Sequence, residues 1–145
     1  MIRLPLIAEL LPQSAPMILL DEVVAFDGVR ICCRTTIRRD SMFVNEGRVR
    51  AIVALEYMAQ AVAAFAGMRG RAAGAAPRIG YVLGTRELTL EADHFAIGDQ
   101  LVVDAEEVWD DERMASFRCR VSRDGRCVAE AGLNVYRPAR EEPSA

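Results

Sequence analysis

An almost unbroken apolar run occupies the middle of the chain, from Ala51 to Met68. The run is rich in alanine, also contains leucine and methionine, and has no proline, which favours a helix. Gly67 and Gly70 lie where this helix is expected to end, and Arg69 suits its negative C-terminal end. Because the helix has almost no polar face, we expect protein to surround it.

Much of the remaining chain alternates between apolar and polar positions, as strands with one buried face do. The segment from Val29 to Arg38 alternates in this way, and so do the last two predicted strands. Turn signals such as Asp27-Gly28 separate the segments. The predicted strands are 17–26, 29–38, 79–90 with a break at Gly84, 100–109, 114–122 and 126–136, and a short helix is predicted within 4–11. This order predicts an α+β fold in which an antiparallel sheet curls around one long helix.

One small sheet gives an apolar helix of this length too little cover. A symmetric dimer in which two sheets join edge to edge would supply more cover and remove exposed sheet edges. We therefore expect residues 1–137 to form a single domain that acts as a dimer. The polar residues 138–145 are expected to form a flexible C-terminal tail.

Composition narrows the classes of function. The net charge is −3, so bulk nucleic-acid binding is not indicated. The four cysteines show no CxxC spacing and the chain has one histidine, so neither a zinc site nor another metal site is expected. The first residues have no long apolar core, which argues against a signal peptide. The central helix carries an acid, which argues against a membrane span. We expect a cytoplasmic protein without a cofactor.

Two polar residues interrupt the apolar helix, Glu56 and Gln60. They are four positions apart and therefore lie on one stripe of the helix, one turn from each other. A carboxylate in an apolar setting needs a partner or has a chemical role. Two interpretations follow: Glu56 is a structural residue that is ion-paired or reaches solvent, or it is a catalytic group.

Four stretches have a recognisable pattern. They are LLPQSAPMILLD from Leu10 to Asp21, LEYMAQA from Leu55 to Ala61, GYVLG from Gly80 and GDQL from Gly98. Together with the order of elements, they resemble the beta-hydroxyacyl-acyl-carrier-protein dehydratases of the hotdog fold (FabZ-like). Within that group the chain is most similar to the ApeP-like proteins, which are linked to aryl polyene lipid biosynthesis. The resemblance covers about residues 8 to 137 and is most specific in the helix motif.

One departure from the family affects the chemistry. The family's dehydratases carry a catalytic histidine in a Gly-His-Phe-Pro loop before the helix, and residues 40–48 here contain no histidine. Gln13 stands where the family usually has a histidine in the opening motif. The one histidine, His94, follows the helix in sequence, and we interpret it as a turn or surface residue.

The resemblance implies chemistry on acyl thioesters. Dehydration of a 3-hydroxyacyl thioester needs a base, an acid and donors at the thioester oxygen. Glu56 matches the family's helix carboxylate, and Gln60 is its expected catalytic neighbour. Asn45 in the preceding loop is a candidate for substrate binding in place of the missing histidine.

The start of the helix supplies two further groups of candidates. The amides around Ala51, Val53 and Ala54 are expected to bind the thioester oxygen, because helix N-termini present free N–H groups. Arg48 and Arg50 are expected to dock an acidic acyl carrier protein. The substrate would be a thioester of such a carrier or of coenzyme A.

Three functions remain open from the sequence. The first is a 3-hydroxyacyl-thioester dehydratase of fatty acid or aryl polyene biosynthesis that lacks the usual histidine. The second is an acyl thioesterase in which Glu56 activates water or attacks the thioester. The third is a non-catalytic subunit that binds acyl chains or pairs with an active homologue, so both a homodimer and a heterodimer are considered.

Overall fold

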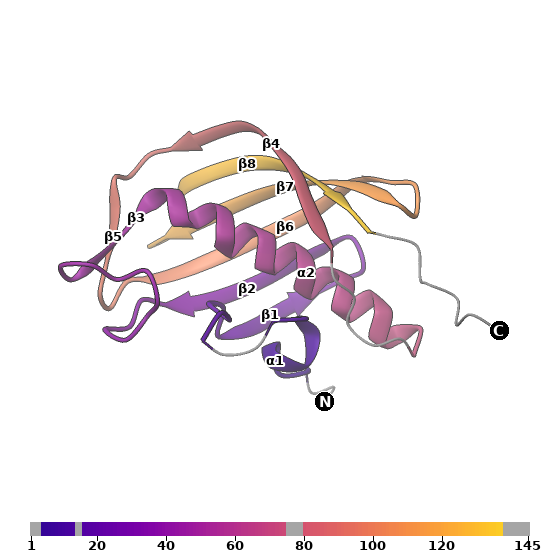
Figure 1. The fold of residues 1–145 in the computed structure, drawn as a ribbon, viewed down its shortest axis with the longest axis horizontal. Coiled ribbons are helices and arrows are strands. Elements are labelled where there is room, and N and C mark those ends of the chain that lie inside the picture. Colours follow the sequence, from indigo (N-terminus) through magenta and orange to yellow (C-terminus); the bar gives the residue numbers. More distant parts are fainter. Residues whose placement is uncertain (1–3, 14–15, 75–79, 138–145) are drawn as a thin grey trace.

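One long helix lies in the curve of one antiparallel sheet (Figure 1). The computed structural model describes residues 4–13, 16–74 and 80–137. The helices are α1 (Ile7–Leu10) and α2 (Ala54–Ala72), and a 3-10 turn, η1 (Ala51–Val53), leads directly into α2. The strands are β1 (Glu22–Phe26), β2 (Arg30–Thr36), β3 (Arg48–Arg50), β4 (Tyr81–Leu90), β5 (His94–Ala96), β6 (Gln100–Asp110), β7 (Met114–Arg123) and β8 (Arg126–Tyr136).

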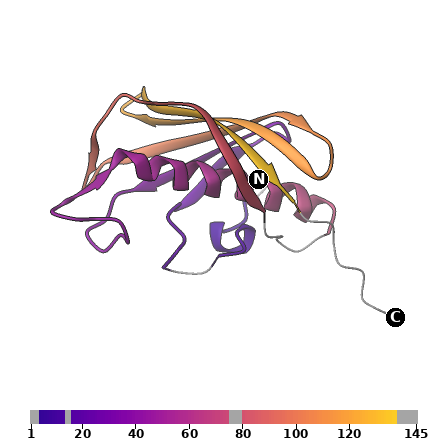
Figure 2. The ribbon, with the colours of Figure 1, turned by 45° about the horizontal axis from the view of Figure 1, so that its top comes forward.

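Six of the strands form the main sheet, in the order β1-β2-β6-β7-β8-β4, and β3 pairs with β5 in a separate two-stranded sheet. All neighbouring strands are antiparallel. Alternate residues of the strands are buried, so one face of the main sheet is apolar. Figure 2 shows this sheet arching over one side of α2. The predicted sheet around a central helix is therefore confirmed.

Aromatic side chains fill the space between the helix and the sheet near the C-terminal half of α2. The Phe65 ring lies edge-on to Phe26 of β1, with centroids 5.4 Å apart, and to Phe117 of β7, with centroids 5.2 Å apart. Such edge-to-face pairs stabilise a core beyond the area that they bury. The turn and helix from Ala51 to Ala72 are long and apolar enough to cross a membrane by length and composition alone. Of the apolar window in this segment, 56% is buried inside the described structure.

The helix ends later than predicted. It continues to Ala72, past Met68 and both predicted stop glycines. Gly67 is instead a packing position, because a Cβ there would lie 2.4 Å from the carbonyl oxygen of Leu10 in α1. The left-handed residue that ends the helix is Gly74, with φ +75°, and its amide donates to Arg71.

Three other segments differ from their predictions. The strand predicted over 17–26 is limited to β1, and residues 17–21 are an extended strap outside the sheet. The paired strands β3 and β5 were not predicted. The predicted break at Gly84 is a register shift within one continuous strand, β4. The predicted flexible tail, 138–145, lies outside the described residues.

Candidate active site

Gln60 is fully buried, with 0% of its surface exposed. Its Nε2 donates to the carbonyl of Met17 at 2.7 Å and to Oε1 of Glu56 at 3.1 Å. Its Oε1 accepts from the amides of Leu19 at 2.8 Å and Leu20 at 3.4 Å. The side-chain amide therefore fixes the strap 17–21 against α2 and orients Glu56 at the same time.

Thr35 holds the strap from the other side. Its hydroxyl donates to the carbonyl of Leu19 at 2.7 Å. Among the described residues, Thr35 and Gln60 are the two buried polar side chains, and between them they satisfy both backbone groups of Leu19. A strap that crosses the core between α2 and β2 needs such partners, because unpaired buried backbone groups are costly.

Glu56 lies on the wall of a cavity of about 430 Å³. This volume is within the usual range for a small-molecule site. Along α2 the wall includes small side chains spaced by three and four residues, which leave room beside the helix. Three of these residues are Ala59, Ala63 and Ala66. Apolar residues of the main sheet form the opposite wall: Val82, Ala115, Phe117 and Val135.

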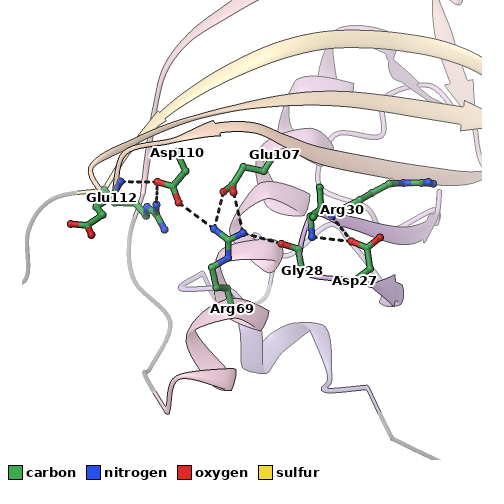
Figure 3. Close-up of polar contacts among 9 residues, drawn as sticks. Asp27, Gly28, Arg30, Arg69, Glu107, Asp110 and Glu112 are labelled. Atoms are coloured by element: carbon green, nitrogen blue, oxygen red, sulfur yellow. Dashed lines mark hydrogen bonds and ion pairs between the residues drawn. The ribbon is translucent and has the colours of Figure 1, made fainter.

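Polar residues that were not predicted for the site also line the cavity. Arg69 and Glu107 line it, as do Gln13 and Arg137. The Arg69 guanidinium makes two parallel bonds to the Glu107 carboxylate, at 2.9 and 3.0 Å (Figure 3). From the sequence, Arg69 was expected to be a favourable charge at the helix end and not a residue of the site. Gln13 could have been predicted for the site, because it stands where the family usually has a histidine in the opening motif.

The predicted substrate-binding residues lie before or at the start of α2, and none of them lines the cavity. Asn45 is exposed and exchanges backbone hydrogen bonds with Arg48 across a tight turn. The Ala51 amide already donates to the carbonyl of Asp93 at 2.9 Å. The Ala54 amide donates to carbonyls within η1, and Val53 is half-buried there. Binding of a thioester oxygen by the Ala51 or Ala54 amide would require these bonds to be given up.

The predicted docking residues Arg48 and Arg50 are both exposed on β3. Neither forms an ion pair within the described residues, whereas Arg69 and Arg71 do. His94 is exposed on β5, where its backbone pairs with that of Arg50. It lies therefore close to the start of α2 in space, although it follows α2 in sequence.

Tyr57 follows Glu56 in the helix motif, and burial changes the pKa of its phenol. Burial raises the pKa of Tyr57 to about 12. The Tyr57 ring packs near Phe95 of β5, with centroids 6.4 Å apart, and the residue is 2% exposed. Its phenol therefore keeps its proton near neutral pH, and Tyr57 belongs to the core.

A long apolar helix wrapped by a single antiparallel sheet of this topology defines a hotdog-fold protein. The family model for ApeP dehydratase (ApeP-like) matches residues 5–145, and the chain belongs to this family. The dehydratase heterocomplex ApeI:P from Xenorhabdus doucetiae is similar to it, with 30% identity and a TM-score of 0.90. That match covers 94% of this chain and 93% of the other.

More distant structures share the fold alone. A hypothetical thioesterase with coenzyme A from Streptococcus pneumoniae TIGR4 is 13% identical, with a TM-score of 0.64 and coverage of 83% and 88% of the two chains. An HP0420-homologue from Helicobacter felis is also 13% identical, with a TM-score of 0.69 and coverage of 98% and 96%. No match was found among curated proteins.

Proposed function

We propose that this protein is a subunit of a 3-hydroxyacyl-thioester dehydratase, with Glu56 as its catalytic acid–base residue. The observation that carries the proposal is the placement of Glu56 on the wall of an apolar cavity, held there by buried Gln60. None of the ion pairs among the described residues includes Glu56, which argues against a purely structural role. Membership of a dehydratase family supports the reaction type.

In the dehydration reaction the substrate loses one proton to a base and receives one proton from an acid. A base removes a proton from carbon 2 of the acyl chain, next to the thioester carbonyl. The carbon–oxygen bond at carbon 3 then breaks, and an acid protonates the departing hydroxyl to give water and a 2-enoyl thioester. A carboxylate in the first turn of a helix, such as Glu56 in α2, can serve either step, because the helix N-terminus favours negative charge nearby.

The second acid–base group is proposed to come from another hotdog chain. The loop before α2 contains no histidine, and His94 is exposed on β5. The similar structure from Xenorhabdus doucetiae is described as a dehydratase heterocomplex, which supports pairing with a homologue. A histidine from such a partner would complete the site around Glu56.

The edge strand β4 is the proposed joining surface. Only β8 pairs with it, so its other side is an open sheet edge within the described residues. Val82 and Leu83 expose large apolar side chains there, 47% and 56% respectively. Val82 also lines the cavity, so a chain that extends the sheet at β4 would lie against the cavity that Glu56 lines.

Acyl carrier protein is the proposed carrier of the thioester. Arg48 and Arg50 are exposed cations at the start of α2, on the same end of the helix as Glu56. Large apolar side chains are also exposed nearby in sequence, at Met42, Phe43 and Ile52. Acidic carrier proteins are attracted by surfaces that combine positive charge with apolar contacts.

The experiment incubates the protein with 3-hydroxyacyl thioesters of acyl carrier protein and of coenzyme A. The chain is tested alone and together with a histidine-bearing hotdog homologue from the same source. Mass spectrometry follows the loss of 18 mass units that marks release of one water. We expect dehydration with the homologue present and little without it. Thioester hydrolysis instead of water loss would favour a thioesterase, and activity of the homologue alone, unchanged by this chain, would favour a non-catalytic subunit.

A further inference from the structure

Charged residues line the cavity near the C-terminal end of α2. Arg69 lies thirteen residues after Glu56 on α2, which is about 20 Å along the helix axis at 1.5 Å per residue. Besides its two bonds to Glu107, the Arg69 guanidinium donates to Asp110 at 3.2 Å (Figure 3). Arg69 and Glu107 line the same cavity as Glu56, so its wall carries a carboxylate near the start of α2 and an ion pair near the end of α2.

Several elements hold the Arg69–Glu107 pair in place. Arg69 also donates to the carbonyl of Gly28, in the turn between β1 and β2, at 2.9 Å. Arg137, directly after β8, donates to Asp110 at 2.9 Å. The Glu107 side chain is only 15% exposed. A bidentate, partly buried pair with this many anchors is less mobile than an ordinary surface ion pair.

Aromatic surface continues beneath the ion pair. The guanidinium carbon of Arg69 lies 4.7 Å from the centre of the Phe65 ring. Phe65 in turn packs on Phe26 and Phe117. Phe65 and Phe117 also line the cavity, so the ion pair lies next to apolar aromatic side chains in the cavity wall. Removal of both charged side chains would extend the apolar part of the cavity.

We propose that the Arg69–Glu107 ion pair is the end stop of the cavity and sets the longest acyl chain that the protein accepts. The inference rests on the proposed function, because it takes this cavity as the acyl-chain site. Each methylene buried against the apolar walls should strengthen binding about fourfold. A methylene that reaches the ion pair gains nothing, since it meets hydrogen-bonded charges whose partners it cannot replace.

The test measures binding of saturated acyl N-acetylcysteamine thioesters of increasing length by calorimetry. The wild-type affinity should rise with chain length and then stop rising. In the Arg69→Ala/Glu107→Ala double variant the limit should move to longer chains by two or more carbons, with about fourfold per added methylene. The double variant removes both charges, so neither is left unpaired. Ala66→Leu narrows the wall before the ion pair and should move the limit to shorter chains.

The matched control is Arg118→Ala/Glu130→Ala, which removes a 2.8 Å ion pair from the outer face of the sheet. It should leave the length limit unchanged. The same limit in the wild type and in the Arg69→Ala/Glu107→Ala variant would overturn the inference, and so would a wild type that binds no chain of any length. Binding with a movable limit but without dehydration contradicts only the proposed function. Dehydration with an unmoved limit contradicts only the end stop.

Discussion

Gln60 holds Glu56 from one helical turn away, through a hydrogen bond of 3.1 Å from its Nε2 to Glu56 Oε1. The same amide binds three backbone groups of the strap 17–21. The orientation of the candidate catalytic carboxylate is therefore coupled to the folding of a segment about forty residues earlier in the chain. Gln60, which we predicted as a catalytic residue, is better placed to position Glu56 than to contact a substrate, because its hydrogen-bonding groups are used within the chain.

Replacement of Gln60 by leucine should destabilise the protein. The change leaves the buried amides of Leu19 and Leu20 without their partner, and the part-buried carbonyl of Met17 also loses its hydrogen bond. We expect the free energy of unfolding to fall by about 2–4 kcal/mol, given the cost of unsatisfied buried groups. Urea denaturation measures this. Gln100→Leu, the same change at an exposed position, should stay within about 0.5 kcal/mol of wild type. Equal stability of the two variants would contradict the strap's dependence on Gln60.

Gly67 should not tolerate alanine. In an isolated helix alanine is the better residue, but a Cβ at this position meets the Leu10 carbonyl oxygen at 2.4 Å. The clash should outweigh the gain in helix propensity and cost about 1–3 kcal/mol by displacing α1. Gly84→Ala is the control, because nothing lies within 4 Å of its added Cβ. Thermal denaturation of both variants tests the prediction, and a Gly67→Ala variant as stable as wild type would disprove the contact.

Stability should fall at alkaline pH. Burial raises the pKa of the Cys33 and Cys119 thiols from 9.0 to about 12. In the unfolded chain these thiols lose their protons near 9.0, while the folded protein retains them. Their contribution to stability is therefore complete below that pH and is lost progressively as the pH rises toward 12. Melting temperatures between pH 8 and 11 measure the decline, at about one-unit intervals.

A Cys33→Ala/Cys119→Ala double variant is the control for this pH dependence. It should be less stable than wild type at neutral pH, because it loses buried volume. Its melting temperature should fall less steeply above pH 9.0, since two of the groups that ionise in the unfolded state are gone. Parallel curves for the two proteins would mean that other groups cause the alkaline loss.

Charge reversal at Arg48 and Arg50 should weaken binding of an acidic carrier protein. Glutamate at both positions replaces two exposed cations beside the start of α2 and should also flatten the salt dependence of binding. Arg113→Glu, in the turn between β6 and β7, reverses a charge beside the other end of the helix. Titration calorimetry with an acylated carrier at two salt concentrations distinguishes the variants. If Arg113→Glu weakened carrier binding equally, the effect would come from the net charge of the protein and not from a docking site at Arg48 and Arg50.

The central helix and the alternating strands could be predicted because their patterns are long and local. The end of the helix could not be predicted from the sequence. Gly67 resembles a helix-terminating glycine, and its role as a packing position becomes visible only when α1 packs on it. The strands β3 and β5 have three residues each, which is too short for a periodic pattern. Their pairing depends on the path of the whole sheet.

The candidate site was likewise predictable only in part. Glu56 and Gln60 could be selected because polar residues are conspicuous in an apolar helix. The bonds from Gln60 to the strap, and from Arg69 to Glu107 across 38 positions, arise from tertiary packing and have no local signal. Which polar residues reach the cavity wall depends on the twist of the whole sheet, which no single strand encodes.

Turnover by a Glu56→Gln variant tests the central claim most directly. Glutamine has nearly the same volume and can still accept the Gln60 hydrogen bond, so the melting temperature should stay level. Loss of the base should lower the dehydration rate by about 100-fold or more, the usual worth of an acid–base group. Both proteins are assayed with a 3-hydroxyacyl thioester in the presence of the histidine-bearing homologue. Equal turnover of the variant and the wild type would contradict a catalytic role for Glu56.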